Sequence, residues 1–225
     1  MTGLKLSEIN EAVERTIDYF AVKESVLPFR KFPGADIMLG PEMKSTGEVM
    51  GLYKDFGLAF AKSQEAAGNN LPRSGSVFIS VKNSMRRNII FMAKMISSMG
   101  FKIFASEGTW RVLSSNGINV KMVPKIGEGK PDIIDLIKAN DINLVINVPA
   151  GKKSQMDSKP IRSAAVSQGI PYITTLEGAQ AAISGMDSTE RTGFSVKPIQ
   201  EYTETSQTKT RKYKHDLDLR HSMWN

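Results

Sequence analysis

The chain has 225 residues, of which 40% are hydrophobic and 24% are charged, and its formal net charge at pH 7 is +7. This is the composition of a globular protein, with enough residues for one large domain or two small ones. The sequence has no cysteine and no apolar run near the roughly 20 residues of a membrane-spanning helix, which excludes disulfides, thiolate metal sites and membrane spans.

The first region of the chain, residues 1 to about 68, contains two predicted helices. A polar helix is predicted over Leu6–Tyr19, with Ser7 placed to cap it. A second helix is predicted over Gly57–Ala67, because this segment is rich in alanine and other good helix formers. The turn-forming residues of Gly68–Gly75 then indicate a linker.

A segment rich in glycine and proline lies between those helices. It is Phe29–Gly51, with the sequence FRKFPGADIMLGPEMKSTGEVMG. Because glycine and proline both interrupt regular backbone, we expect a folded loop here rather than a helix or a strand. The charged residues Glu42, Lys44 and Glu48 within it are interpreted as scaffolding rather than as metal ligands.

The second region, Ser76 to about Met186, alternates between short strands and helices. The predicted elements are, in order, strand Ser76–Val81, helix Ser84–Met99, strand Phe101–Ala105, helix Gly108–Ser115, strand Ile118–Val123, helix Pro131–Ala139, strand Ile142–Val148, helix Lys159–Gln168, strand Pro171–Thr174 and helix Leu176–Ser184. This alternation predicts an α/β fold, a five-stranded parallel sheet with helices on both faces.

The third region, Asp187–Asn225, is polar and charged, with too little apolar content for a core. We expect a mobile tail, in which the basic run Lys209–Lys214 is solvated. Basic residues are not gathered into one stripe with interleaved aromatics, so no nucleic-acid partner is expected. The start of the chain lacks the pattern of a signal peptide, and we expect a cytoplasmic protein.

Polar residues and glycines follow four consecutive predicted strands. They are Ser106-Glu107-Gly108-Thr109, Pro124–Lys130 with Lys125 and two glycines, Asn147–Lys153, and Thr174-Thr175. In a parallel α/β sheet the carboxyl ends of the strands share one edge, where helix N-termini offer free N–H groups to a phosphate. The sequence therefore predicts a phosphate site at this edge, with ordinary turn and cap chemistry as the alternative.

Two adjacent stretches resemble the carbamoyl-phosphate synthase large-subunit family. Residues from about Val22 to Gln64 are similar to the end of its second ATP-grasp unit, and Ser76 to about Met186 is similar to its methylglyoxal-synthase-like domain. The ending SVKPIQEY at Ser195–Tyr202 is similar as well. The resemblance implies that residues 1–70 are the C-terminal remnant of the carbamate-phosphorylating ATP-grasp unit, residues 74–186 a methylglyoxal-synthase-like regulatory domain and residues 187–225 a flexible polar tail.

The resemblance also implies an effector site for a nucleotide monophosphate, which is uridylate or inosinate in bacterial members. The positions that match the family's site are Arg86, Ser106, Thr109, Lys125 and Asn147. Val148 and Pro149 depart from two threonines of the family pattern, which leaves the identity of the effector open. A second, ornithine-type site at the domain junction is implied at Glu24, Leu27 and Thr174.

By the same resemblance, the chain is part of an ATP-dependent ligase and holds no complete catalytic site. It would couple effector binding to carbamoyl phosphate synthesis from glutamine or ammonia and bicarbonate. No cofactor or metal is expected in this chain, whereas ATP and magnesium are expected for the complete enzyme. The expected partners are the remainder of the large subunit, the glutaminase small subunit and the nucleotide, without a membrane.

Two alternatives remain open. One is a free-standing nucleotide-sensing module that docks on a separate synthetase chain. The other is a methylglyoxal-synthase-like lyase, which the sequence disfavours because the only histidines, His215 and His221, lie in the tail. The carboxylates Asp132, Asp135 and Asp157 could serve as a base, but the first two are better explained as helix charges.

Overall fold

The structure is a computed structural model that describes residues 3, 5, 17–26, 47–149 and 158–202. The chain divides into two compact units, residues 21–194 and a smaller unit of residues 1–20 with 195–225. In the smaller unit, the rings of Tyr19 and Tyr202 meet edge to face with centroids 5.4 Å apart. In the part of the chain that is described, no helix is long and apolar enough to cross a membrane.

The larger unit is built on a five-stranded parallel sheet, which confirms the predicted α/β fold. Its strands are β3 (Ser76–Val81), β4 (Lys102–Ser106), β5 (Val120–Val123), β6 (Leu144–Val148) and β7 (Tyr172–Ile173). They lie in the order β5-β4-β3-β6-β7. Ile79 of the central strand is paired with Ala105 on one side and Ile146 on the other. The strand order thus reverses at β3, the kind of position where parallel sheets bind ligands.

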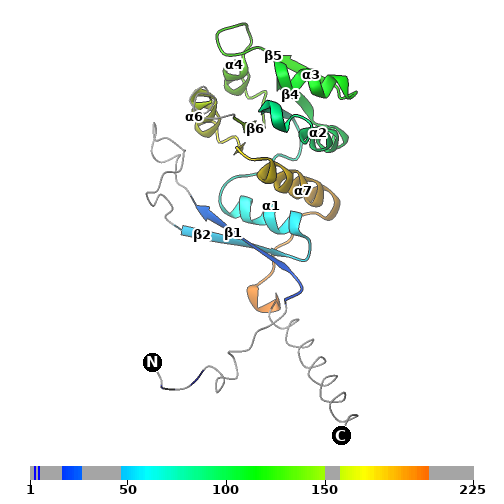
Figure 1. The fold of residues 1–225 in the computed structure, drawn as a ribbon. Coiled ribbons are helices and arrows are strands. Elements are labelled where there is room, and N and C mark those ends of the chain that lie inside the picture. The colour runs from blue at the N-terminus through cyan, green and yellow to red at the C-terminus, as the bar shows by residue number, and fades with distance from the viewer. Residues whose placement is uncertain (1–2, 4, 6–16, 27–46, 150–157, 203–225) are drawn as a thin grey trace. The chain divides into compact units, whose positions relative to one another are not determined.

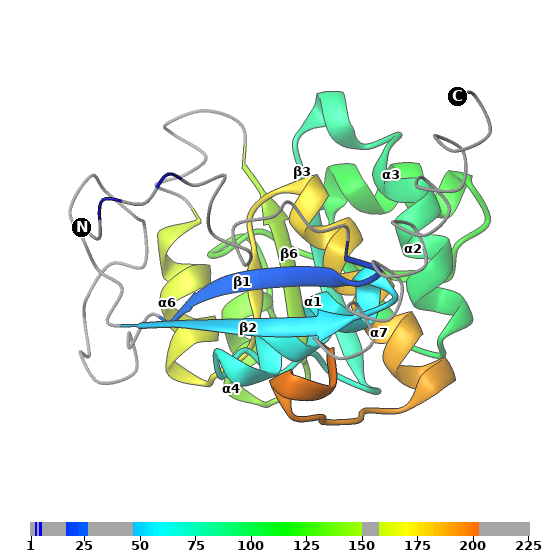
Figure 2. The ribbon, with the colours of Figure 1, turned by 90° about the horizontal axis from the view of Figure 1, so that it is seen from below.

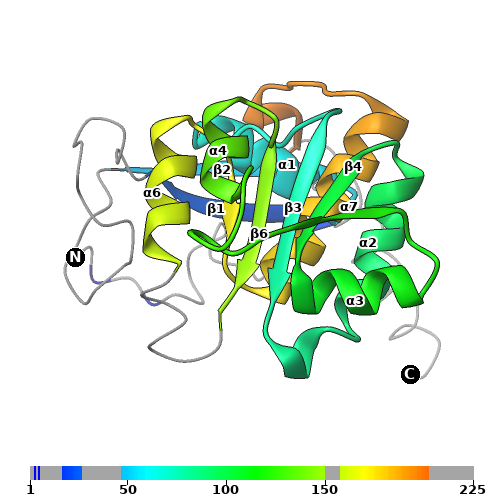
Figure 3. The ribbon, with the colours of Figure 1, turned by 90° about the horizontal axis from the view of Figure 1, so that it is seen from above.

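Helices cover both faces of the sheet (Figure 3). One face carries α2 (Ile89–Ser98), α3 (Glu107–Ser115) and α7 (Leu176–Thr192), and the other carries α4 (Ile133–Lys138) and α6 (Lys159–Ser167). Each face has its own apolar core, because successive strand residues point to opposite sides. Val77 and Ile79 belong to the first core and Phe78 to the second.

The larger unit also contains a two-stranded sheet and a helix ahead of β3 (Figure 1). The strands β1 (Phe20–Val26) and β2 (Gly47–Tyr53) run antiparallel, and α1 (Phe56–Ala66) lies against them (Figure 2). On its other side α1 packs on α7. The two helix backbones approach closely there, because a Cβ at Gly57 would lie 2.5 Å from the Ser184 carbonyl oxygen.

Two expectations for the first region need correction. Residues 17–19, the end of the predicted helix Leu6–Tyr19, are not helical; the rest of that helix, with Ser7, lies outside the described residues. Gly47–Gly51 was expected to be loop and instead begins β2. A glycine fits this strand because a Cβ at Gly51 would collide with the Ala59 carbonyl oxygen of α1. The remainder of the predicted loop, residues 29–46, lies outside the described residues.

Two helices of the second region differ most from their predicted bounds, and the other three differ by one or two residues at an end. The helix predicted from Ser84 begins at Ile89, after a 3-10 turn at Asn83–Met85. The last helix does not stop at Ser184 but continues to Thr192. Its added turns bury small and polar residues against α1, among them Gly185 and Ser188, so they lack the apolar spacing that reveals a helix in sequence.

Candidate functional site

The predicted site residues lie at or beyond the carboxyl ends of neighbouring strands. Ser106 ends β4 and is paired with Val123, two residues before Lys125. Asn147 lies on β6 and is paired with Ser80 of β3. Arg86 follows the 3-10 turn after β3. The topology thus brings residues that are far apart in sequence to one edge of the sheet.

The first turn of α3 offers unpaired backbone donors next to a cation. Ser106 is the N-cap residue, but its side chain makes no capping hydrogen bond. The guanidinium group of Arg86 lies over this turn, since a Cβ at Gly108 would be 2.5 Å from Arg86 Cζ. Arg86 Nη1 donates to Asn83 Oδ1 at 3.2 Å, and Arg86 Nε is buried without a hydrogen-bond partner. A helix N-terminus with an adjacent arginine is a favourable environment for an anion.

Thr109 joins this turn to the central strand. It is fully buried, and its Oγ1 accepts from the Val81 backbone N–H at 3.1 Å. Ser106 Oγ donates to the same oxygen at 3.3 Å. The structure therefore brings Ser106 and Thr109 together, and it gives the Thr109 hydroxyl a structural hydrogen bond within the protein.

Lys125 lies in the turn after β5 with 70% of its side chain exposed. Its Nζ is 3.3 Å from Glu128 Oε1. An exposed pair of this kind contributes about 0–1 kcal/mol, so the ammonium group can exchange its partner for another anion at little cost.

Asn147 belongs to a buried polar cluster on the α6 side of the sheet. It is 4% exposed, and its Nδ2 donates to the Tyr172 hydroxyl at 2.8 Å. Arg162 and Ser158, both 5% exposed, also make hydrogen bonds that act on this hydroxyl. Burial raises the pKa of Tyr172, and the three hydrogen bonds oppose that shift. The Tyr172 hydroxyl therefore stays protonated at neutral pH.

Tyr172 and Arg162 were missed by the sequence analysis. A signal for Arg162 was present, because it lies three residues before Ala165 and so shares the buried face of α6. A basic residue on a buried helix face usually has a specific polar environment. The sequence has no such signal for Tyr172, because tyrosine is a common residue in short strands.

A cavity of about 250 Å³ lies beside one residue of the predicted junction site, Thr174. Thr174 lines this cavity, and so does Gln64 of α1, whose Nε2 donates to Glu24 Oε2 at 2.6 Å. Glu24 is thus connected to the cavity through Gln64. Leu27, the third predicted residue, lies outside the described residues.

The carboxylates weighed as possible bases hold α4 together. Asp132 Oδ1 accepts from the backbone N–H groups of Ile134 and Asp135, and Asp135 Oδ2 accepts from that of Asp132, which makes a capping box. The hydrogen bond from Lys130, followed by that from the Asp132 N–H, lowers the pKa of Asp135. Asp157, His215 and His221 lie outside the described residues, and the described part contains no cluster of potential metal ligands.

Comparisons with known proteins agree with this architecture. Residues 88–174 match the family described as MGS-like domain. The chain is 46% identical over 202 residues to the carbamoyl phosphate synthase large chain of Nostoc sp., and 44% identical over 207 residues to that of Archaeoglobus fulgidus. These matches cover 90% and 92% of this chain but 18% and 19% of the relatives, so the chain spans about a fifth of their length.

A solved structure, methylglyoxal synthase from Elizabethkingia anophelis NUHP1, is similar over 51% of this chain and 80% of that chain, with a TM-score of 0.43 and 16% identity. The chain is similar to the MGS-like domain over residues 88–174, and over about 90% of its length it is similar to carbamoyl phosphate synthase large chains.

Proposed function

We propose that this chain acts as the C-terminal regulatory part of a carbamoyl phosphate synthase large chain and binds a nucleotide monophosphate. The phosphate would lie at the first turn of α3, with Arg86, Ser106, Lys125 and Asn147 around the nucleotide. One observation carries this proposal. The Arg86 guanidinium group lies over Gly108, next to the first backbone N–H groups of α3, to which the Ser106 side chain makes no capping hydrogen bond.

Effector binding would reach the rest of the large chain through α7 and α1. These two helices approach closely at Gly57 and Gly185, so a displacement of one would be transmitted to the other. The readout would be a change in apparent ATP affinity, with a coupling free energy of about 1–3 kcal/mol. ATP and magnesium would be used by other parts of the large chain, and the glutaminase small subunit would be a further partner.

The proposal is tested by calorimetric titration of this chain with uridine and inosine monophosphates. Both nucleotides are needed, because Val148 and Pro149 leave the effector open. Binding of at least one is expected, and no heat with either in a folded sample would contradict the proposal.

Arg86→Gln is expected to weaken that binding roughly 10- to 100-fold, because a hydrogen bond to a charged group contributes about 1.5–3 kcal/mol. The matched control is Arg87→Gln, which removes the same charge from the neighbouring exposed residue. Equal losses in both variants would mean that net charge, rather than the Arg86 site, attracts the nucleotide.

Lys125→Ala provides an independent test of the same site. It should weaken binding, whereas Lys212→Ala, a change in the basic run of the tail, should not. The lyase alternative gains no support from the described residues, since Asp132 and Asp135 are engaged in capping α4.

A further inference from the structure

The turn after β5 brings the side chains of Lys125 and Glu128 together. The Glu128 N–H donates to the Lys125 carbonyl oxygen at 2.9 Å, and Gly127, the third residue of this turn, has a φ of 81°. A turn of type II needs a positive φ at its third residue, which glycine adopts without strain. Because the backbone closes the turn, its two end side chains meet, with Lys125 Nζ 3.3 Å from Glu128 Oε1.

The loop that carries this turn is closed behind it and fixed to α4. A Cβ at Gly129 would lie 3.1 Å from Cβ and Cγ of Pro124, so the residues on either side of the turn are in contact. The next cation, Lys130, has its Nζ 2.7 Å from Asp135 Oδ2 and 3.4 Å from Asp132 Oδ2. Its charge is balanced by these two carboxylates, which leaves the lysine of the turn as the cation of this loop that is available to a ligand.

The two cations of the proposed phosphate site differ in their partners. Arg86 Nη1 donates to the neutral amide oxygen of Asn83 at 3.2 Å, whereas Lys125 is paired with a carboxylate. Among the described residues, Glu128 is the partner that the structure gives to Lys125. The protein itself therefore supplies an anion to the ammonium group that the nucleotide phosphate would contact.

A phosphate and the Glu128 carboxylate would compete for the Lys125 ammonium group. Both are anions, and like charges placed side by side repel each other. The Glu128 side chain can leave, because 61% of it is exposed and water can solvate its charge. Phosphate binding then exchanges one ion pair for another, and the affinity is reduced by the free energy of the pair that is lost.

We propose that Glu128 is an internal competitor of the nucleotide phosphate, which must displace its carboxylate from Lys125 to bind. The inference rests on the proposed function, because it needs a phosphate beside Lys125. Glu128 thereby sets the affinity of the site and favours ligands that carry an anionic group, since a neutral ligand would leave the ion pair intact. A residue that only stabilised the turn would have the opposite effect, because its loss would weaken binding.

The test is calorimetric titration of the full chain with the nucleotide monophosphate that binds. Glu128→Gln keeps the size of the side chain and the backbone hydrogen bond of the turn, and it removes the charge. This variant is expected to bind the nucleotide roughly two- to fivefold more tightly, the equivalent of up to about 1 kcal/mol for an exposed ion pair. The titration is done at low ionic strength, because salt screens the interaction between exposed charges.

A double-mutant cycle shows whether this effect depends on Lys125. In Lys125→Ala there is no ammonium group for which the two anions can compete. Adding Glu128→Gln to this variant should therefore change the dissociation constant by a factor close to one. An equal gain with and without Lys125 would mean that Glu128 repels the phosphate directly, and it would overturn the proposed competition.

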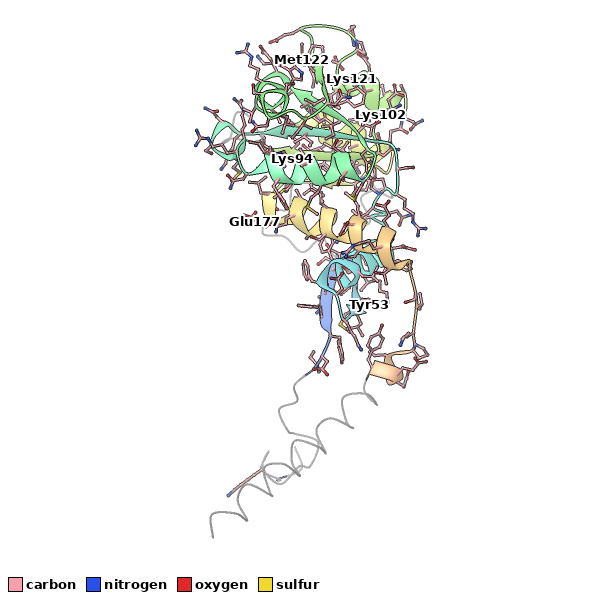
Figure 4. The ribbon with its side chains drawn as sticks, turned by 90° about the vertical axis from the view of Figure 1, so that its right-hand side faces the viewer. Tyr53, Lys94, Lys102, Lys121, Met122 and Glu177 are labelled. Carbon is pink, nitrogen blue, oxygen red and sulfur yellow. The ribbon has the colours of Figure 1, made fainter. Side chains whose placement is uncertain are left out.

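Glu177→Gln is the matched control for the removed charge. Glu177 is an exposed residue in the first turn of α7, and Figure 4 shows it away from Lys121 and Met122 of β5, the strand that leads into the turn. This variant should leave the dissociation constant unchanged. A gain equal to that of Glu128→Gln would mean that the net charge of the chain is responsible, which would also overturn the inference.

The outcomes separate this inference from the proposed function. Unchanged or weaker binding in Glu128→Gln would overturn the competition and leave the nucleotide site standing. An absence of nucleotide binding to the unmodified chain would instead overturn the proposed function, and the inference would fall with it.

Discussion

At the scale of single residues, Thr109 shows how one hydroxyl can support a site without facing its ligand. Its Oγ1 accepts from the Val81 N–H inside the core and so fixes the first turn of α3 to the end of β3. Thr109→Val removes that acceptor and leaves a buried N–H unpaired. We expect a loss of about 1–3 kcal/mol in the free energy of unfolding, measured by urea denaturation.

The matched variant Thr109→Ser keeps the acceptor and is expected to retain most of the stability. It loses only a methyl group, about 0.8 kcal/mol for a buried carbon. Because Thr109→Val keeps the methyl group, a loss in Thr109→Ser with none in Thr109→Val would show that the methyl group, and not the hydrogen bond, holds α3 to β3.

A second residue-scale prediction concerns acid sensitivity at the start of α1. The pKa of Asp55 is lowered from its ordinary value of 3.8, first by the hydrogen bond from the Ser188 hydroxyl at 2.6 Å and then by the Leu58 N–H. A carboxylate whose pKa is lower in the folded state stabilises the fold above its unfolded pKa. That contribution is lost as the pH falls through the folded value.

Ser188→Ala removes the largest cause of this shift. Near pH 7 we expect a loss of about 0.5–1.5 kcal/mol, the usual range for one hydrogen bond. Well below the ordinary carboxyl pKa of 3.8, as the pH falls through the lowered pKa of Asp55, the difference from the unmodified chain should shrink, because Asp55 becomes protonated in both. Urea denaturation at both pH values is the measurement, with Ser167→Ala as control, since that hydroxyl bonds only to Ala164 of its own helix. A difference that is the same at both pH values would contradict the assignment to Asp55.

Also at the scale of residues, the sequence could predict those site residues whose types and positions after predicted strands suggest phosphate binding. Ser106 and Lys125 stand out because hydroxyl, glycine and lysine residues follow predicted strands. The interactions of Asn147 could not be predicted, since its partner Tyr172 lies 25 residues away and meets it only through the pairing of β6 with β7. Contacts made across a sheet depend on its strand order, which no single segment encodes.

At the scale of elements, apolar periodicity predicted the strands and helices of the parallel sheet well. It failed where packing uses small residues. The part of α7 beyond Ser184 and the strand β2 both meet α1 at residues without a side chain, Gly185 and Gly51. Close backbone contact thus replaces the apolar pattern by which such elements are recognised in sequence.

The same small residues lead to an element-scale prediction. In Gly57→Ala, the new Cβ would lie 2.5 Å from the Ser184 carbonyl oxygen and 2.6 Å from Ser188 Oγ. The first of these atoms is backbone, so α1 and α7 must move apart. We expect a loss of about 1–3 kcal/mol, as for other overpacked contacts, measured by urea denaturation.

Gly47→Ala is the control for this change. Gly47 has no heavy atom within 4 Å of its ideal Cβ position, so the substitution should be nearly neutral. A large loss in Gly47→Ala, or none in Gly57→Ala, would contradict the close packing of α1 on α7.

At the scale of the whole molecule, the parallel sheet and the segment ahead of it lie within one compact unit, residues 21–194. By the resemblance to the family, a domain boundary is predicted at residues 70–74, and this boundary stays a prediction. The structure adds that α1, from the first part, packs directly on α7, which belongs to the core of the second. We therefore expect residues 21–194 to unfold in one cooperative transition.

Trp110 on α3 can report whether that cooperativity exists. The chain has two tryptophans, so Trp224→Phe leaves Trp110 as the only tryptophan. Trp110 packs against the core under α2, α3 and α7. In this background, Gly57→Ala should lower the urea midpoint of unfolding. The shift measured by Trp110 fluorescence should equal the shift measured by far-ultraviolet circular dichroism. The strain is introduced at α1, on the other side of α7, so fluorescence can follow it only if both parts unfold together.

An unchanged fluorescence midpoint, with circular dichroism shifted in part, would mean that the segment ahead of the sheet unfolds separately. A ligand-induced change in the parallel sheet would then need a route to the preceding segment other than α7 and α1.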